Sequence, residues 1–171
     1  MNASARRHKI VEILRAASTP VSAGALAREL GVSRQIIVGD VALLRASGAA
    51  VAATPRGYLL NEAPAKGMRF TVACQHTQDQ IAAELYAVVD NGGEVLDVIV
   101  EHAVYGQIAG ELRVTSRFEV DEFVKQLLTE QALPLSTLTD GVHLHTILCR
   151  DEAMFERIQA ALRREQVLFE A

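Results

Sequence analysis

The first sixty residues alternate apolar and polar positions at a helical period, broken by short turn signals. In "ARRHKIVEILRAAS" the apolar residues recur three and four positions apart, which predicts an amphipathic helix. The next stretch, "VSAGALARELGVSRQIIVGDVALLRASG", predicts two helices that begin after Ser22 and after Ser33, with a tight turn at Gly31 between them. The segment "AAVAATPRGYLLN" has two short extended runs around a turn, which predicts a β-hairpin.

Helix, helix, tight turn, helix and hairpin form, in this order, a winged helix-turn-helix. We expect the third helix to expose Ser33, Arg34 and Gln35, whose side chains suit phosphates and base edges, and the hairpin to add Arg56. The alternative is that Arg34 and Gln35 are only solvated residues of a first helical turn. The expected anchors of the two helices to the core are Leu26, Leu30, Ile36, Ile37, Val41 and Leu44.

After a short linker predicted over residues 61–69, which contains Pro64 and Gly67, the pattern alternates between strands and helices. Strands are predicted for "RFTVACQ", "EVLDVIVEH", "GQIAGELRVT", "VHLHTILC" and a short terminal "VLFE". Helices are predicted for "TQDQIAAELYAVVDNGG", "SRFEVDEFVKQLLTE" and "DEAMFERIQAALRREQ". The order β-α-β-β-α-β-α-β predicts an α+β fold, an antiparallel sheet with helices on one side. We therefore expect two domains, residues 1–62 and residues 67–171.

The charge is divided unevenly between these two parts. The chain has 171 residues and a net charge of −4, but residues 1–60 hold eight Lys and Arg against three Asp and Glu, so they carry +5 and the remainder −9. A basic first part indicates that only this part meets a polyanion. No apolar run is long enough for a membrane helix, and the amino terminus lacks the apolar segment of a signal peptide, so we expect a cytoplasmic protein with no membrane partner.

Two histidines stand one residue apart in "DGVHLHTILCR", and alternation along a strand places His143 and His145 on one face. Such a pair by itself is a weak sign of a metal site. The first strand of this part leads to His76, and Glu84 follows eight positions later in a predicted helix. If the two strands are neighbours, three imidazoles and one carboxylate can surround one point. That set of ligands suits Zn²⁺, Ni²⁺, Fe²⁺ or Mn²⁺.

Each of these residues also has a simpler interpretation. Glu84 can be a solvated helix residue, His76 a residue at a helix start, and His102 of "VEHAVYG" a turn residue at the end of a strand. Cys74 and Cys149 lack the spacing of a disulfide framework. For both cysteines we prefer packing in the core to metal ligation.

Four stretches of the chain, "VSRQIIVGDVALLRASG", "ATPRGY", "VVDNGGEVLDVIVEHAVYG" and "GVHLHTI", resemble the bacterial nicotinate-responsive repressors of NAD biosynthesis and niacin transport. In that family a helix-turn-helix precedes a three-histidine (3H) regulatory domain, and the resemblance covers nearly the whole chain. It implies that His76, Glu84, His143 and His145 match the divalent metal ligands of the family. It also implies that nicotinic acid binds near the metal as co-repressor.

The "VEHAVYG" segment supplies our candidate effector-binding residues, His102 and Tyr105. The chain departs from the family pattern at two positions. Ala103 stands where the family usually has proline, which puts the rigidity of this turn in doubt. Gly39 lies inside the expected recognition helix, where relatives tend to carry a longer polar residue, so base preference there can differ.

Three functions compete at this point. The leading one is a metal-dependent repressor, not an enzyme, that binds double-stranded operator DNA as a homodimer and responds to nicotinic acid. The second is a metallo-enzyme that acts on a small carboxylate and is fused to a DNA-binding domain. In the third, the acidic part is a protein-interaction module whose histidines are incidental.

Overall fold

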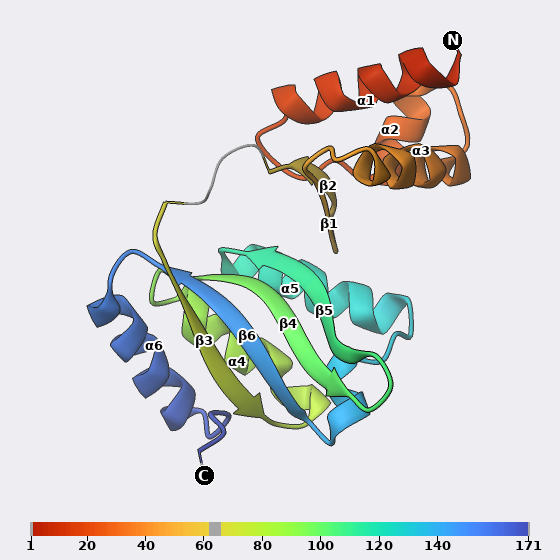
Figure 1. Cartoon of the computed structure of the whole chain (residues 1–171). Helices are drawn as coiled ribbons and strands as arrows, with labels where there is room; N and C mark the ends of the chain where they lie inside the picture. Colours follow the sequence, from red (N-terminus) through yellow and green to blue (C-terminus); the bar gives the residue numbers. More distant parts are fainter. Residues whose placement is uncertain (1, 62–65, 171) are drawn as a thin grey trace. The chain divides into compact units, whose positions relative to one another are not determined.

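The computed structural model describes residues 2–61 and 66–170, and the chain divides into two compact units, residues 1–64 and residues 65–171 (Figure 1). Positions 62–65 of the predicted linker lie outside the described residues. Each unit has its own hydrophobic core. Within the described part of the chain, no helix has both the length and the apolar character that a membrane crossing requires.

The first unit has the predicted order of elements. Its helices are α1 (Ala3–Ala16), α2 (Ala23–Leu30) and α3 (Arg34–Ala46), and its hairpin consists of β1 (Val51–Thr54) and β2 (Gly57–Leu60), paired antiparallel. Ser22 caps α2 and Ser33 caps α3, because each hydroxyl accepts a hydrogen bond from a backbone N–H three residues later. Gly31 ends α2 in the left-handed conformation, with φ of 65°. The winged helix-turn-helix is therefore confirmed.

One expected core anchor of the first unit is wrong. Ile37 is fully buried, whereas its neighbour Ile36 is 41% exposed. Successive side chains of a helix point about 100° apart, so only one of these two isoleucines can face the core. The other buried apolar residues that hold the unit together include Ile10, Leu14, Leu26, Val41 and Val51.

The second unit is built on a four-stranded antiparallel sheet with strand order β3-β6-β4-β5. The strands are β3 (Met68–Gln75), β4 (Glu94–His102), β5 (Gly106–Val114) and β6 (Val142–Cys149). The helices are α4 (Ile81–Val89), α5 (Arg117–Thr129) and α6 (Glu152–Arg164), with 3₁₀ turns η1 (Gln78–Gln80) and η2 (Leu135–Thr139). This arrangement confirms the predicted α+β fold.

The three helices lie on one side of this sheet, with α4 between α5 and α6 (Figure 1). Their apolar sides bury the core against the sheet, with Leu85, Val95, Ile147, Ile158 and Leu162 at its centre. The predicted terminal strand "VLFE" is not a full strand. It forms a single antiparallel bridge to β3, in which Leu168 pairs with Cys74.

The position of β6 decides where the functional side chains meet. It lies between β3 and β4, and its register with β3 pairs His143 with Cys74 and His145 with Val72. The buried side of β6 faces α4, so both histidines point toward that helix. The pairing of β4 with β6 shifts by one residue between Val95 and Ile99, which marks a β-bulge beside His145.

A candidate metal centre in the second unit

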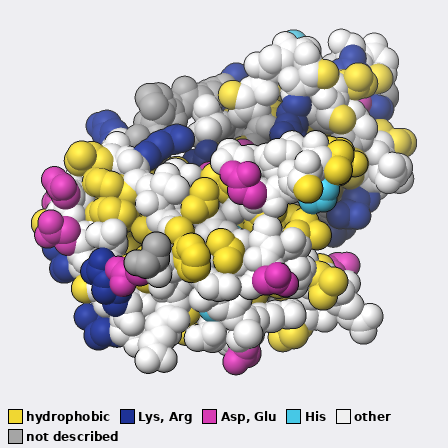
Figure 2. Space-filling model, turned by 60° about the horizontal axis from the view of Figure 1, so that its bottom comes forward, with side chains coloured by type: hydrophobic (Ala, Val, Ile, Leu, Met, Phe, Trp, Pro, Cys, Tyr) yellow, Lys and Arg dark blue, Asp and Glu magenta, His cyan; other side chains and the backbone are white. Residues whose placement is uncertain are grey.

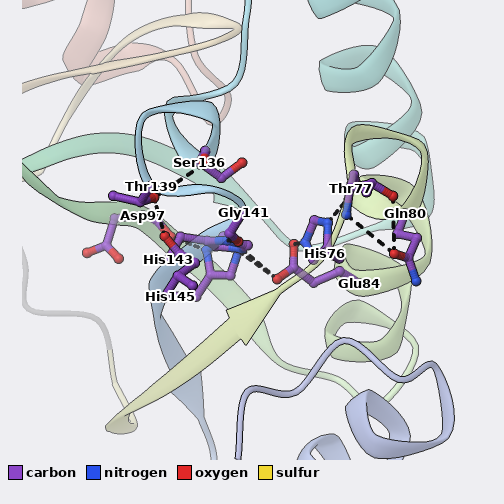
Figure 3. Close-up of polar contacts among 11 residues, drawn as sticks. His76, Thr77, Gln80, Glu84, Asp97, Ser136, Thr139, Gly141, His143 and His145 are labelled. Atoms are coloured by element: carbon purple, nitrogen blue, oxygen red, sulfur yellow. Dashed lines mark hydrogen bonds and ion pairs between the residues drawn. The ribbon is translucent and has the colours of Figure 1, made fainter.

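The Glu84 carboxylate lies among three imidazole rings inside the second unit (Figure 3). Its Oε2 is 2.7 Å from Nε2 of His76, and its Oε1 is 2.8 Å from Nε2 of His143 and 3.3 Å from Nε2 of His145. All four residues are buried, with exposed fractions between 2% and 8%. We call these four residues the histidine cluster. The structure thus brings together the four residues that the sequence proposed as a set.

Three separate elements supply the cluster. His143 and His145 lie on β6, and His76 comes directly after the last residue of β3, the neighbouring strand. Glu84 belongs to the first turn of α4. Helical side chains lean toward the helix N-terminus, so this carboxylate reaches back to the strand ends. On the face drawn in Figure 2, histidine is visible only in small areas, in keeping with the burial of the three rings.

The second nitrogen of each ring is held by the backbone. A carbonyl oxygen can only accept a hydrogen bond, so each Nδ1 must donate its proton to it. A neutral ring with its proton on Nδ1 has a lone pair on Nε2, which is the form that binds a metal. Nδ1 of His76 lies 2.8 Å from the carbonyl oxygen of Thr77. Nδ1 of His143 lies 2.8 Å from that of Gly141, and Nδ1 of His145 lies 2.6 Å from that of Asp97.

The donor atoms of this arrangement require a positive charge at their centre. Three Nε2 lone pairs and a carboxylate are all acceptors, and acceptors cannot hydrogen-bond one another without a shared proton. Nε2 of His76 and of His145 make no hydrogen bond of acceptable geometry among the described residues, although both lie close to Glu84. Protons or a metal ion must therefore balance the cluster, because a buried polar group without a partner is costly. Three imidazoles and a carboxylate form a donor set suited to divalent transition metals.

The pKa shifts show how strongly these groups interact. Burial raises the pKa of Glu84, but the charge of His145, the hydrogen bond from His143 and the close approach of His76 outweigh it and bring the pKa well below its usual range. Burial lowers the pKa of His76 and His145, yet the adjacent Glu84 carboxylate outweighs it and raises both. Both shifts favour a protonated imidazole beside the ionised carboxylate, so the cluster favours a positive charge next to Glu84.

Sequence reasoning missed the residues that orient the rings. Asp97 lies in the bulge of β4, where its carbonyl accepts from His145 and its carboxylate accepts from the backbone N–H of Thr146 at 2.8 Å. Gly141 has a φ of 89°, and a Cβ there would lie 2.5 Å from the carbonyl oxygen of His76. Only glycine fits such a contact. The glycine before "VHLH" was a usable signal, whereas a backbone carbonyl leaves no trace in the sequence.

Both cysteines are buried and unpaired, as expected. Cys149 belongs to the hydrophobic core. Cys74 also contacts that core, but its Sγ, a carboxylate oxygen of Glu84 and a ring nitrogen of His143 all lie within 4.8 Å of one another. Burial raises the pKa of the Cys74 thiol, and the charge of Glu84 raises it further.

The two candidate effector residues lie at the turn between β4 and β5. The rings of His102 and Tyr105 are 5.0 Å apart, and Nδ1 of His102 accepts from the backbone N–H groups of Val104 and Tyr105. Tyr105 is 77% exposed. In the part of the chain that the structure describes, no hydrogen bond, ion pair or ring contact joins either residue to the histidine cluster, so their role remains a prediction.

The candidate DNA-binding residues lie on the first turn of α3 and on the hairpin. Ser33 uses its hydroxyl as the helix cap, and Arg34 and Gln35 are exposed beside it. Ile36 adds an exposed apolar side chain to the same turn. Arg56 lies half-buried in the turn between β1 and β2. Their contacts with DNA remain a prediction.

Comparison with known proteins agrees with this division of the chain. A family model described as an HTH domain matches residues 6–59, and one described as the 3H domain matches residues 69–171. The "Probable transcription repressor NiaR" of Thermotoga maritima is 47% identical over 165 residues, which cover 96% of this chain and 94% of that protein. The "Transcription repressor NadR" of Bacillus subtilis is 37% identical over 166 residues, which cover 95% of this chain and 92% of that protein.

Proposed function

The chain belongs to the family of transcription repressors that join a helix-turn-helix to a 3H domain, and we propose that it is a metal-dependent, nicotinic-acid-responsive repressor of genes for NAD biosynthesis or niacin transport. In this proposal residues 1–62 bind operator DNA, and residues 67–171 bind the metal and the effector. The observation that carries it is the convergence of three Nε2 atoms and one buried carboxylate, with each Nδ1 held by a carbonyl.

Membership of this family identifies the chain as a transcription repressor and not an enzyme. The rival metallo-enzyme also needs a general acid or base next to the metal. Within the histidine cluster the only carboxylate is Glu84, which already contacts all three rings. The cluster therefore supports binding of an ion better than turnover of a substrate.

We propose His76, Glu84, His143 and His145 as the ligands of one divalent ion, of the class that includes Zn²⁺, Ni²⁺, Fe²⁺ and Mn²⁺. A bound cation would supply the positive charge that attracts a carboxylate effector. Nicotinic acid carries such a carboxylate, and we place it near the metal. We retain His102 and Tyr105 as its candidate contacts, because they offer a polar ring and an aromatic ring at one turn. Nicotinate must bind the DNA-binding conformation more tightly than the conformation that does not bind DNA, because otherwise it does not change the equilibrium between them.

On the DNA side, we propose that Ser33, Arg34 and Gln35 meet the major groove and that Arg56 meets the backbone. The net charge of +5 in residues 1–60 supports this assignment. A homodimer would place two such helices about 34 Å apart on a two-fold operator.

We place the dimer contact in the second unit. Large apolar side chains there reach the surface, including Phe118, Leu128 and Leu133, which are 71%, 68% and 76% exposed. Figure 2 shows apolar side chains at several places on the drawn surface, between scattered acidic ones. Such exposed apolar area is typical of interaction sites.

The decisive experiment measures bound metal and operator affinity on the full chain, with and without nicotinate. We expect the wild type to bind about one divalent ion and to bind its operator more tightly with nicotinate. His145→Ala should lose the metal and the nicotinate effect but keep weak DNA binding. His8→Ala, which changes an exposed histidine of α1, should keep the metal. A chelated wild type that still responds fully to nicotinate would contradict the proposal.

A further inference from the structure

Cys74 faces the histidine cluster from β3. Its side chain is fully buried, and alternation along the strand places it on the same face as Val72, whose strand partner is His145. Across the ladder Cys74 pairs directly with His143. Paired residues of antiparallel strands have their Cβ atoms about 4.5–5.5 Å apart, so both side chains reach the same space.

The distances suit a shared ion. Sγ of Cys74, a carboxylate oxygen of Glu84 and a ring nitrogen of His143 lie within 4.8 Å of one another. Ligand atoms that surround one tetrahedral zinc-like ion at about 2.0–2.3 Å are separated by about 3.3–3.8 Å. The three atoms therefore need to move together by at most about 1.5 Å to share one centre. The buried Nε2 atoms of His76 and His145, which lack hydrogen-bond partners among the described residues, lie beside the same carboxylate.

We propose that Cys74 is a fifth metal donor, and that its thiolate makes the site select thiophilic ions such as Zn²⁺, Co²⁺ or Ni²⁺ over Mn²⁺. This inference rests on the proposed function, because it requires that the histidine cluster holds a metal. The sequence favoured core packing for Cys74, and this inference assigns metal ligation to it as well. Sulfur ligands favour softer metals, whereas carboxylates alone would suit Mn²⁺ or Mg²⁺.

Binding exchanges one bond for another. The S–H bond of Cys74 breaks, its proton leaves to solvent, and the sulfur lone pair forms a bond to the metal. The nearby cation stabilises the thiolate, which burial beside Glu84 otherwise disfavours. The thiolate and the Glu84 carboxylate then balance the charge of a divalent ion, and the three imidazoles remain neutral.

Cys149 provides a matched control. It is equally buried, with 1% of its surface exposed, and it lies on the same side of β6 as His143 and His145. Its strand partner is Met68, and it stands six residues beyond His143, about 20 Å along an extended strand. Substitution of either cysteine by serine removes one buried thiol, but only Cys74→Ser touches the cluster.

The test loads the full chain with Co²⁺ and records its near-ultraviolet absorption, where a cobalt–thiolate bond produces a charge-transfer band. We expect the band in the wild type and in Cys149→Ser, and its loss in Cys74→Ser at unchanged cobalt stoichiometry. Competition should show that Cys74→Ser weakens Zn²⁺ binding by about tenfold or more and Mn²⁺ binding much less.

Stoichiometric cobalt without the band in the wild type, or an unchanged band in Cys74→Ser, would overturn the inference. A wild type that binds no cobalt or zinc at all would instead contradict the proposed function. X-ray absorption of the zinc-loaded wild type identifies the atoms bound to zinc, so this measurement does not require that any variant folds. One sulfur at about 2.3 Å from zinc supports a Cys74 ligand, and a shell of nitrogen and oxygen alone refutes it.

Discussion

Among the described residues, each unit buries one carboxylate, and the two carboxylates differ in the charge of their partners. In the first unit Asp40 is 4% exposed, and its oxygens lie 2.5 Å from Nε of Arg6 and 3.5 Å from a guanidinium nitrogen of Arg7. In the second unit Glu84 is 2% exposed, and its ion-pair partners among the described residues are imidazoles. Guanidinium is always charged, whereas imidazole is charged only when a proton is added.

This difference separates a structural ion pair from a candidate functional site. Asp40 is balanced permanently and ties α3 to α1. Glu84 is balanced only when a cation joins the cluster, either as protons or as a metal ion. A buried charge whose partners are conditional makes stability and binding depend on conditions. The comparison therefore supports the proposal that the ligand-responsive site lies in the second unit.

The largest expected effect follows from exchanging the two carboxylates for amides. Glu84→Gln should lower metal affinity by about 100-fold or more, because the only anionic oxygen of the histidine cluster is lost. Asp40→Asn should leave metal affinity unchanged but destabilise the first unit by about 2 kcal/mol, because two guanidinium groups lose their counter-ion. Isothermal titration with zinc and urea unfolding of the chelated protein measure the two quantities.

The contrast between Glu84 and Asp40 is wrong if Asp40→Asn lowers metal affinity, or if Glu84→Gln leaves it unchanged. A loss of metal binding in Asp40→Asn would mean that the ion sits outside the cluster. Metal affinity that survives in Glu84→Gln would show that Glu84 is a structural carboxylate like Asp40.

A smaller effect is expected at Gly141, which directly precedes β6 and whose built Cβ would lie 2.5 Å from the carbonyl oxygen of His76. Gly141→Ala should destabilise the second unit by about 2 kcal/mol, since the new Cβ meets this carbonyl and φ is positive. The control is Gly106→Ala, with φ of 72° and open space around its Cβ, which should cost only about 1 kcal/mol. Thermal unfolding of both variants compares them, and equal losses would argue against a special contact at Gly141.

In the first unit, Arg34→Ala should weaken operator binding by about 1–3 kcal/mol if Arg34 reads a base, and less if it touches only phosphate. The loss of operator affinity caused by Arg34→Ala should not depend on the metal concentration, as long as nicotinate still acts on the protein. Binding to operator and to random DNA decides between the two roles. Equal weakening on both DNAs would exclude base recognition by Arg34.

The smallest effect is that of pH on metal affinity. Burial lowers the pKa of His76 and His145, but Glu84 outweighs it and raises both above the usual 6.5, so protons occupy the rings at a higher pH than in a free imidazole. Metal must displace these protons, so affinity should increase as pH rises through the folded-state pKa values and decrease as pH falls. We expect about a tenfold loss from about pH 7.5 to 6.5, which corresponds to the displacement of one proton on average. Zinc titrations at several pH values measure it, and a flat profile would indicate that the rings are already neutral.

Prediction from the sequence succeeded where the structure depends on a local pattern of residues. The helix caps at Ser22 and Ser33, the turn at Gly31 and the hairpin were all confirmed, because each depends on a few neighbouring residues. The exposure of Ile36 was missed, since a run of two isoleucines does not tell which one faces the core. The predicted terminal strand "VLFE" was wrong, because the segment forms only one bridge at Leu168. The length of a β-ladder depends on the partner strand, which the sequence of a short segment does not specify.

The amino-acid sequence by itself determined the order of the elements and the basic and acidic parts, and it offered the four residues of the histidine cluster as candidates, which the family resemblance supported. Only the tertiary structure decided that β6 lies next to β3, because strand neighbours are chosen by long-range packing and not by local propensity. That pairing placed His143 opposite Cys74 and both beside Glu84. It also supplied the backbone carbonyls of Thr77, Asp97 and Gly141, whose positions depend on how the folded chain passes the rings and not on any side chain.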